Sequence, residues 1–306
     1  MEKIKIATRN SPLALWQAEH VKEQLINVHP GLEVELVGMQ TEGDRFLGAP
    51  LLAVGGKGLF IKELEQALLN READIAVHSM KDVTIDLPDD LILPVIMQRE
   101  DTHDVLISNS YKTIDELPEQ GVLGTSSLRR KSKIMAPRLD LSIKDLRGNV
   151  GTRLRKLDAD EYDAILLAAA GIKRLGLAER ISQSIPHTQL LPAIGQGAIG
   201  IECRDNDSDV YELIAPLNDD ETSICVQTER AFSRRLFGGC QLPIAGQATL
   251  IDEQINLHGL VARVDGSEVI KGQHKGDRAD IDDIGTALAE SLLAQGADKI
   301  LQELLH

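Results

Sequence analysis

Aromatic and cysteine side chains are scarce in this chain of 306 residues. Aromatic residues make up 3% of the sequence and apolar residues 42%, so any core must be built from aliphatic side chains. Three cysteines leave at least one thiol unpaired, which is typical of a reducing compartment, and no CxxC or Cys–His metal spacing occurs. A Walker-type phosphate loop and a GxGxxG motif are also missing. We therefore expect neither a metal nor a nucleotide cofactor.

Long apolar runs are missing as well. The first residues, Met-Glu-Lys-Ile-Lys-Ile-Ala-Thr, lack the apolar stretch of a signal peptide, and no run approaches a membrane span. We expect a cytoplasmic protein that does not bind membranes. The net charge of −15 disfavours nucleic acid as a partner, because phosphate backbones are bound by basic surfaces. No coiled-coil pattern or apolar stripe requires a second subunit, so a monomer is expected.

The basic residues are concentrated in one stretch of this acidic chain. Between residues 123 and 155, nine lysines and arginines accompany only two acidic residues, a net charge of +7. A basic segment in an acidic protein suits a small polyanion held in a cleft, because the acidic exterior repels larger anionic polymers. A solvated basic helix face is the alternative interpretation.

Strand and helix patterns alternate through the first 200 residues. Such alternation is typical of mainly parallel sheets covered by helices. The expected strands are 4–8, 33–39, 74–79, 104–108, 121–124, 140–143, 164–167 and 199–203, and the expected helices are 12–27, 59–69, 127–136 and 150–157. Pro88, Pro94 and the charged stretch 98–103 indicate a hinge into a second unit, and strand 199–203 could return to the first.

The last third of the chain follows another pattern. A helix at 223–236 precedes a predicted antiparallel meander, and one or two amphipathic helices fill 281–305. The meander strands are 245–251, 254–264 and 267–275. The fold class is therefore α/β: two periplasmic-binding-protein-like α/β domains around a cleft, plus a small α+β C-terminal domain. The predicted domain bounds are 1–98 with 198–216, then 103–192, then 219–306.

Polar residues gather where the predicted strands end. In open parallel sheets, ligands bind at the carboxyl ends of strands, where helix N-termini favour anions. Arginine adds a planar fork that matches a carboxylate with two parallel hydrogen bonds. The residues at these junctions are Arg9, Ser11, Lys81, Asp82, Thr125, Ser127, Arg129, Arg130, Arg147, Asn149 and Arg153. Ser11 and Asn149 are the expected N-caps of the helices that follow them. Carboxylates are therefore the expected ligands, ahead of nucleotide phosphates.

Asp82 is the unusual carboxylate among these cationic residues. A paired surface aspartate is the common explanation for such a residue. The alternative is an anion that stabilises positive charge developing during a reaction, or that moves a proton. His78 falls inside the preceding predicted strand and is expected to be structural.

Cys240 follows Gly238 and Gly239 in a turn near the end of helix 223–236. The glycines accept unusual backbone angles and leave the sulfur unshielded. A lone exposed thiol suggests a nucleophile or a covalent attachment point. Taken alone, the turn favours a small apolar residue that fills a gap, because free cysteines are often buried. The rest of the chain reverses that preference.

Together these segments resemble the porphobilinogen deaminase (hydroxymethylbilane synthase) family. The resemblance covers nearly the whole chain, and seven motifs in the same order make it specific. These motifs are residues 6–14, 55–60, 76–82, 124–130, 146–150, 191–197 and 238–240. Phe237 departs from the more polar residue expected before the glycine pair, but this does not affect the sulfur or its access.

The resemblance implies a transferase of porphyrin, tetrapyrrole and heme biosynthesis, with a dipyrromethane cofactor joined to Cys240 through a thioether. Such an enzyme condenses four porphobilinogen molecules head to tail, releases ammonia, and frees linear hydroxymethylbilane by hydrolysis. By motif match, Asp82 is catalytic. The implied cofactor-binding residues are Lys81, Asp82, Thr125, Ser127, Arg129, Arg130, Arg147 and Asn149. The implied substrate-binding residues are Arg9, Ser11, Arg147, Arg153 and Arg174.

Residues 40–58 contain five glycines and no periodicity, which fits a lid over a site. The lid residues implied by the match are Lys57 and Phe60.

The chemistry expected from the residues agrees with the resemblance. Each porphobilinogen carries two carboxylates, so a growing chain needs many arginines, and loss of ammonia leaves a pyrrole-stabilised cation that Asp82 could stabilise.

Two other functions stay open on the residues alone. A binding protein without catalysis would also place two α/β lobes around a cleft, but it would need neither Cys240 nor Asp82. A cysteine-dependent hydrolase is the third possibility, and the sequence offers no convincing histidine partner for the thiol.

Overall fold

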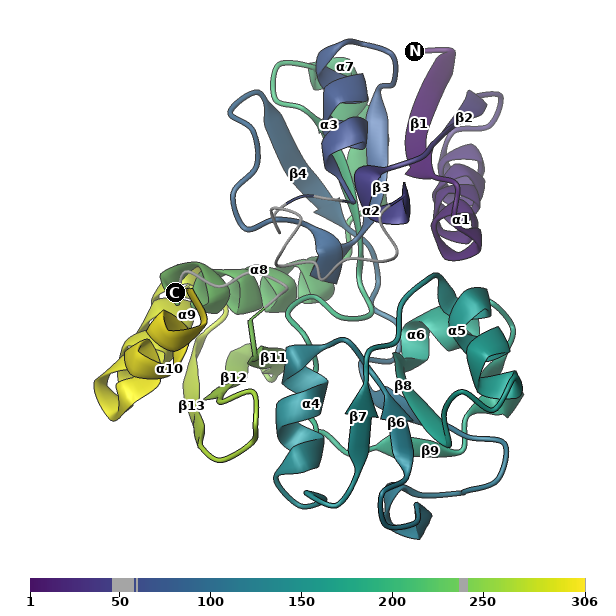
Figure 1. Cartoon of the computed structure of the whole chain (residues 1–306). Coiled ribbons are helices and arrows are strands. Elements are labelled where there is room, and N and C mark those ends of the chain that lie inside the picture. The colour runs from purple at the N-terminus through teal and green to yellow at the C-terminus, as the bar shows by residue number, and fades with distance from the viewer. Residues whose placement is uncertain (46–57, 59, 237–241, 306) are drawn as a thin grey trace. The chain divides into compact units, whose positions relative to one another are not determined.

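The computed structural model describes residues 1–45, 58, 60–236 and 242–305 (Figure 1). The chain divides into two compact units: Met1–Glu100 with Ala198–Ser223, and Asp101–Gly197 with Ile224–His306. None of the described helices combines the length and the apolar composition needed to cross a bilayer.

The first unit is built on a five-stranded sheet of order β2-β1-β3-β10-β4. The strands are β1 (Lys3–Arg9), β2 (Glu33–Met39), β3 (Ile75–Ser79), β4 (Leu91–Ile96) and β10 (Ile199–Arg204). The helices are α1 (Pro12–Val28), α2 (Glu42–Arg45), α3 (Lys62–Leu69) and α7 (Ser208–Ile214), with 3₁₀ turns η2 (Met80–Asp82) and η5 (Ala215–Leu217). β1 pairs in parallel with β2 and β3, and β10 runs antiparallel between β3 and β4. The predicted return of strand 199–203 to this unit is confirmed.

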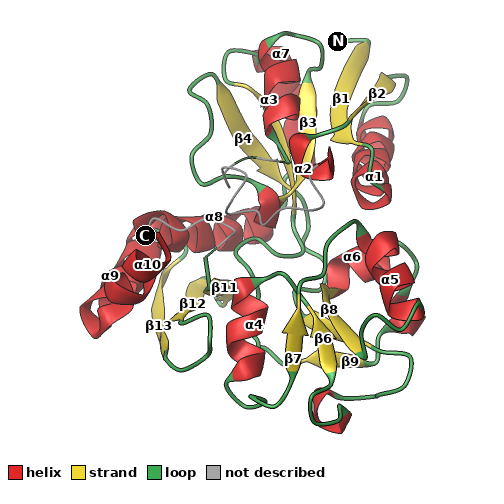
Figure 2. Cartoon of the chain, in the orientation of Figure 1, coloured by secondary structure: helices red, strands yellow, loops and turns green. Residues whose placement is uncertain are grey.

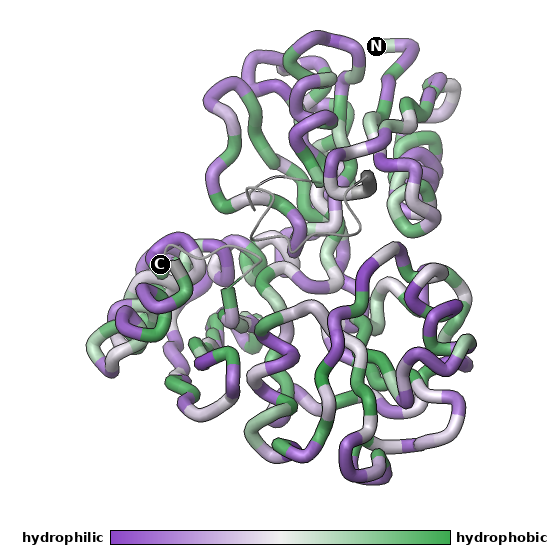
Figure 3. Tube along the Cα trace, viewed as in Figure 1, coloured by the Kyte–Doolittle hydropathy of each residue, from purple (hydrophilic) through white to green (hydrophobic). Residues whose placement is uncertain are grey.

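Helices cover both faces of this sheet (Figure 2). On one face, α1 and α7 pack against Ile6 of β1, Val77 of β3 and Ile201 of β10. On the other face, α3 packs against Ala7 and Ala76. The hydropathy of residues along α1 alternates between hydrophilic and hydrophobic, as expected for a helix with one face on a sheet (Figure 3).

The prediction of a hinge at Pro88 and Pro94 was wrong in part, because Pro94 lies inside strand β4. β4 forms the edge of the sheet, and its pairing with β10 shifts register between Ile201 and Cys203. Proline donates no backbone hydrogen bond and is therefore tolerated on edge strands and at bulges. The crossing between the units lies farther on, between Glu100 and Asp101, within the predicted stretch 98–103.

The second unit contains another five-stranded sheet, of order β7-β6-β8-β5-β9. The strands are β5 (Asp104–Ile107), β6 (Val122–Gly124), β7 (Ser142–Lys144), β8 (Ala164–Ala168) and β9 (Gln183–Ile185). The helices are α4 (Leu128–Met135), α5 (Val150–Asp158) and α6 (Ala169–Arg174), with 3₁₀ turns η3 (Ile114–Glu116) and η4 (Ala178–Arg180). β6 is parallel to β7 and β8, while β5 is antiparallel to β8 and β9. α5 and α6 cover one face of this sheet and α4 covers the other.

The predicted meander is also confirmed. It consists of β11 (Ile244–Ile251), β12 (Gln254–Ala262) and β13 (Val269–Asp277), paired antiparallel in that order. Its helices are α8 (Asp220–Arg235), α9 (Ile281–Leu292) and α10 (Asp298–Leu305), with a short π-helical segment η6 (Leu293–Ala297) between the last two. Phe232 of α8 is fully buried in the core that these helices form with the meander. The predicted α/β, α/β and α+β architecture is therefore confirmed, and the exact domain bounds stay a prediction.

A buried carboxylate, that of Asp104, ties α4 to the second sheet. Its Oδ2 accepts a hydrogen bond from Arg129 Nη1 (2.6 Å), and its Oδ1 accepts from Nε and Nη2 of Arg130 (2.9 and 2.7 Å). Arg130 also donates to the carbonyl oxygen of Leu166 in β8, and Arg129 donates to that of Leu191. All three charged side chains are buried. The first turn of α4 is thus fixed to the sheet by charge-assisted hydrogen bonds.

Replacing Asp104 by Asn should destabilise the fold strongly. Burial alone would raise the pKa of Asp104, but the guanidiniums of Arg129 and Arg130 lower it well below its ordinary value. Removing one partner from such a buried network costs about 3–5 kcal/mol. A lowered pKa adds stability above the unfolded pKa of about 3.9, and this contribution is lost as the pH falls. Urea unfolding measures the difference in unfolding free energy between wild type and Asp104→Asn. This difference should therefore be largest above about pH 5 and should become smaller below about pH 4.

Asp140→Asn is the matched control. Asp140 also pairs with an arginine, Arg138, at 2.7 Å, but this pair is partly exposed. Its removal should change the unfolding free energy little. Equal losses for the two variants would show that the buried network at Asp104 does not anchor α4.

Candidate functional site

The predicted site residues divide between the two units. In the first unit, β1 and β3 are adjacent and parallel, so their carboxyl ends lie at the same edge of the sheet. Arg9 is the last residue of β1, and the turn after β3 carries Lys81 and Asp82. Asp82 is half-buried and forms no ion pair with another described residue. The structure therefore brings Arg9, Lys81 and Asp82 to one sheet edge, as the sequence predicted.

Ser11 begins α1 at this edge. Its Oγ accepts a hydrogen bond from the backbone N–H of Ala14 (3.3 Å), and Pro12 occupies the first helical turn. This is the predicted N-cap, and it is confirmed. The cap fixes where α1 starts, immediately after Arg9.

Gln17 is a residue that the sequence reasoning missed. Its side chain lies on the buried face of α1, and its Nε2 donates to Ser79 Oγ (2.9 Å). The tie holds the end of β3, from which the Lys81–Asp82 turn emerges. A polar residue among Ala14, Ala18 and Val21 on an otherwise apolar helix face was the available signal.

Phe60, a predicted lid residue, contacts the predicted substrate-binding residue Arg9. The guanidinium carbon of Arg9 lies 4.3 Å from the centroid of the Phe60 ring, a cation–π contact. The ring also lies against Gly43, where a Cβ atom would come within 2.2 Å of it. The glycine thus makes room for the ring. Lys57 lies outside the described residues.

In the second unit, two loops meet at the carboxyl ends of β6 and β7. These strands are parallel neighbours, so the N-termini of α4 and α5 follow at the same edge. Ser127 Oγ accepts from the N–H of Arg130 as the cap of α4, and Asn149 Oδ1 accepts from that of Thr152 as the cap of α5. Ser126 joins the loops through hydrogen bonds with both backbone groups of Leu146. The predicted N-cap role of Asn149 is confirmed.

Thr125 and Arg147 complete this edge. Thr125 is buried, and its Oγ1 accepts from the N–H of Ser127. Arg147 is half-buried and pairs with no carboxylate of the described chain. Hydroxyl, amide and guanidinium groups at two helix N-termini form a donor set suited to carboxylates.

The remaining predicted arginines lie in other surroundings. Arg153 donates from Nε to the carbonyl oxygen of Gly148, which holds the loop before α5. Arg174, at the end of α6, donates to the carbonyl oxygen of Gly197. Arg129 and Arg130 are buried against Asp104. For all four arginines, a contact with a ligand carboxylate stays a prediction.

The thiols of the two described cysteines are poor nucleophiles. Cys203 and Cys225 are both buried. Burial, with a smaller effect of Asp207, raises the pKa of Cys203 to about 11. The thiolate is the reactive form, so Cys203 is essentially unreactive near neutral pH. Cys240 lies outside the described residues.

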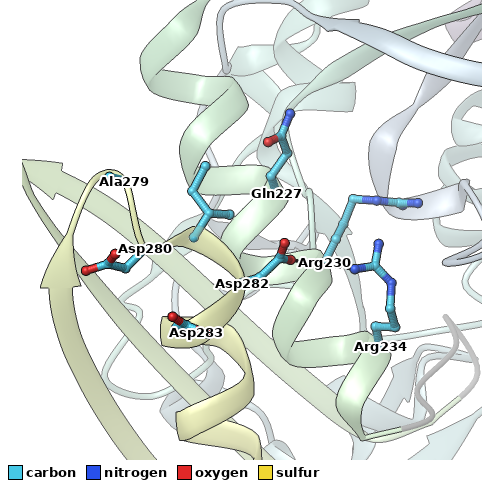
Figure 4. A pocket seen from close by; sticks show the side chains of 8 residues that line it. Gln227, Arg230, Arg234, Ala279, Asp280, Asp282 and Asp283 are labelled. Atoms are coloured by element: carbon cyan, nitrogen blue, oxygen red, sulfur yellow. Dashed lines mark ion pairs between the residues drawn. The ribbon is translucent and has the colours of Figure 1, made fainter.

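A pocket of about 450 Å³ lies between α8 and the start of α9 (Figure 4). Arg230 and Arg234 line it together with Asp280, Asp282 and Asp283, and Arg234 Nη1 is 3.7 Å from Asp282 Oδ1. Three carboxylates in the lining repel a polycarboxylate ligand. None of the predicted site residues that the structure describes lines this pocket.

Solved structures similar to this chain include three binding proteins. The methionine-binding protein MetQ is 15% identical, with a TM-score of 0.45, and the match covers 71% of this chain and 89% of that one. A nutrient-binding protein from Burkholderia cenocepacia bound to methionine is 14% identical, with a TM-score of 0.43 and coverage of 69% and 90%. The periplasmic aliphatic sulphonate-binding protein SsuA from Escherichia coli is 12% identical, with a TM-score of 0.42 and coverage of 76% and 70%.

Two family models match the sequence itself. The model described as porphobilinogen deaminase, dipyromethane cofactor binding domain, matches residues 4–212. The model described as porphobilinogen deaminase, C-terminal domain, matches residues 223–294. The two matches follow each other without overlap and cover nearly the whole chain, including both strand-end edges described above. The chain belongs to the porphobilinogen deaminase family.

Proposed function

We propose that this protein is a hydroxymethylbilane synthase. It condenses four porphobilinogen molecules head to tail onto a dipyrromethane attached to Cys240, releases ammonia, and frees linear hydroxymethylbilane by hydrolysis. The observation that carries the proposal is the match of both family models in order along the chain. We propose further that the enzyme acts as a cytoplasmic monomer.

The donor set of the second unit supports a ligand with several carboxylates. Ser127 and Asn149 cap two helices whose N-termini meet at one sheet edge, and Arg147 adds a guanidinium there. In the proposal, this edge binds the acetate and propionate groups of the cofactor. When bound, the dipyrromethane supplies the terminal pyrrole carbon to which the next substrate is joined.

Asp82 is the proposed catalytic residue. Loss of ammonia from porphobilinogen leaves a pyrrole-stabilised cation, and a carboxylate placed beside it lowers the energy of that charge. The same carboxylate can accept the proton that is lost once the new carbon–carbon bond has formed. Arg9, at the same sheet edge, is proposed to hold a carboxylate of the incoming substrate.

Cys240→Ser should abolish both the covalent cofactor and most of the activity. A hydroxyl is a much weaker nucleophile than a thiolate and forms no thioether. The measurement is the intact mass of the denatured protein, purified from cells that make porphobilinogen. The wild type should exceed its sequence mass by one dipyrromethane, and the variant should not. The control, Cys225→Ala, removes a buried thiol and should keep the added mass.

A wild-type protein of unmodified mass would contradict the attachment. It would instead favour a binding protein of the same architecture, without catalysis.

Asp82→Asn should preserve the fold and the cofactor but lower kcat by at least about 10²-fold, the usual effect of losing a positioned charge or acid–base group. Turnover is measured with porphobilinogen on protein whose cofactor content is known from its mass. Asp86→Asn removes an exposed carboxylate from the same segment and should leave kcat unchanged. Equal turnover of Asp82→Asn and wild type would remove Asp82 from the mechanism.

Arg147→Gln is the sharpest test of carboxylate binding. Arg129→Leu or Arg130→Leu would also stall assembly or elongation, but each removes one of the two guanidiniums that neutralise the buried Asp104 and disturbs the fold as well. Losing a charged hydrogen bond costs about 1.5–3 kcal/mol, so kcat/KM should fall about tenfold or more. Arg155→Gln is the control, because Arg155 is an exposed arginine of α5, the helix that follows the Arg147 loop. Equal kcat/KM for the two variants would contradict a binding role for Arg147.

A further inference from the structure

A buried histidine–carboxylate pair lies behind the Asp82 turn. His78 Nε2 is 2.8 Å from Glu202 Oε2, and the two side chains are only 3% and 1% exposed. His78 belongs to β3 and Glu202 to β10, which pair antiparallel, with His78 opposite Gly200 and Glu202 opposite Ala76. Because a carboxylate accepts, the proton of this hydrogen bond belongs to Nε2. The pair therefore joins two strands across the centre of the sheet.

The pair faces α3. Side chains alternate along a strand, and Ile199, Ile201 and Cys203 of β10 face the opposite side with α1 and α7. Glu65 of α3 is half-buried, and both members of the pair act on it electrostatically. Burial first, and then the charge of Glu202, raise the pKa of Glu65 to about 6, while His78 opposes the shift. Burial between α3 and the sheet therefore disfavours the charged form of a carboxyl group.

Stability alone does not explain such a pair. Replacing both partners of a buried hydrogen bond by apolar side chains of the same shape can be nearly neutral or even stabilising. The second oxygen of Glu202, Oε1, is buried and has no hydrogen-bond partner among the described residues, which adds a cost. A directional bond at this position therefore suggests a requirement for defined geometry.

The segment from His78 to Asp82 is held at successive residues. Ser79 is hydrogen-bonded to Gln17, and the N–H of Met80 donates to the carbonyl oxygen of Ala198 (3.0 Å). The sulfur of Met80 lies over Gly200, where a Cβ atom would come within 2.3 Å of it. Because Ser79 and Met80 are both restrained in this way, a change in the position of His78 also displaces the turn that carries Asp82.

We infer that His78 and Glu202 are positioning residues, whose cross-strand hydrogen bond fixes the end of β3 and thereby the placement of the Asp82 carboxylate. The inference rests on the proposed catalytic role of Asp82. It assigns to the pair a contribution to kcat rather than to substrate affinity, because neither side chain lies at the sheet edge that carries Arg9 and Asp82.

The test compares His78→Leu with His78→Gln in the full-length, cofactor-loaded protein. Leu removes the donor, and kcat should fall by about tenfold or more with KM within about twofold, as expected for a misplaced catalytic group. The amide of Gln can still donate to Glu202, so His78→Gln should recover most of the loss. Glu202→Gln, which keeps an acceptor oxygen, should behave like His78→Gln.

Asp207→Asn is the matched control. It removes a partner of Arg204, a buried cation at the opposite end of β10, where the two side chains lie 2.7 Å apart. This variant should lower Tm without lowering kcat per cofactor-loaded molecule. If His78→Leu lowers Tm but leaves kcat at the wild-type value, the pair is merely structural and the inference is overturned.

Amide hydrogen exchange separates this result from failure of the proposed function. His78→Leu should speed exchange at the amides of Met80 and Val83, and Asp207→Asn should not. This readout needs neither substrate nor turnover. It therefore decides whether the pair orders the turn even if porphobilinogen is not consumed, and unchanged exchange in His78→Leu overturns the inference.

Discussion

The carboxylate of Asp104 is the interaction on which the second unit depends. One buried carboxylate faces two buried guanidiniums, and the carbonyl oxygens of Leu166 and Leu191 accept further hydrogen bonds from them. An apolar cluster of the same volume could be equally stable, but it would not fix the direction of α4. Because Arg129 and Arg130 lie in the first turn of α4, their bonds set where that helix begins. The placement of Ser127 and Thr125 follows from this.

Much of the site could be predicted because it depends on local chemistry and on sheet topology. The N-caps Ser11 and Asn149 bond to groups three residues ahead, so a short stretch of sequence suffices to recognise them. Strand–helix alternation predicts parallel strands, whose carboxyl ends share an edge. From that rule alone, Arg9 and Asp82 are expected at one sheet edge, and Thr125 and Asn149 at another. The meander and its helices followed from their own periodicities in the same way.

The missing features depend on contacts between residues distant in sequence. Gln17 meets Ser79 across 62 positions, and Asp104 meets Arg129 across 25. Counting arginines indicated an anionic ligand, but a count cannot distinguish a guanidinium that faces a ligand from one neutralised by the protein's own carboxylate. Pro94 was misjudged for a similar reason, since proline is compatible with a strand only once that strand is known to be an edge.

In each unit, buried polar bonds lie behind a loop that carries predicted site residues. Asp104 holds the start of α4, and the bonds Gln17–Ser79 and His78–Glu202 hold the end of β3. A site that stabilises a transient cation gains most when its carboxylate needs no rearrangement as the charge appears. In the proposed function the ligand grows by one unit at each step, so it cannot supply that order itself, because its contacts change with every addition. The order must therefore lie in the protein, and buried directional bonds, unlike apolar packing, specify the orientation as well as the distance of the groups they hold.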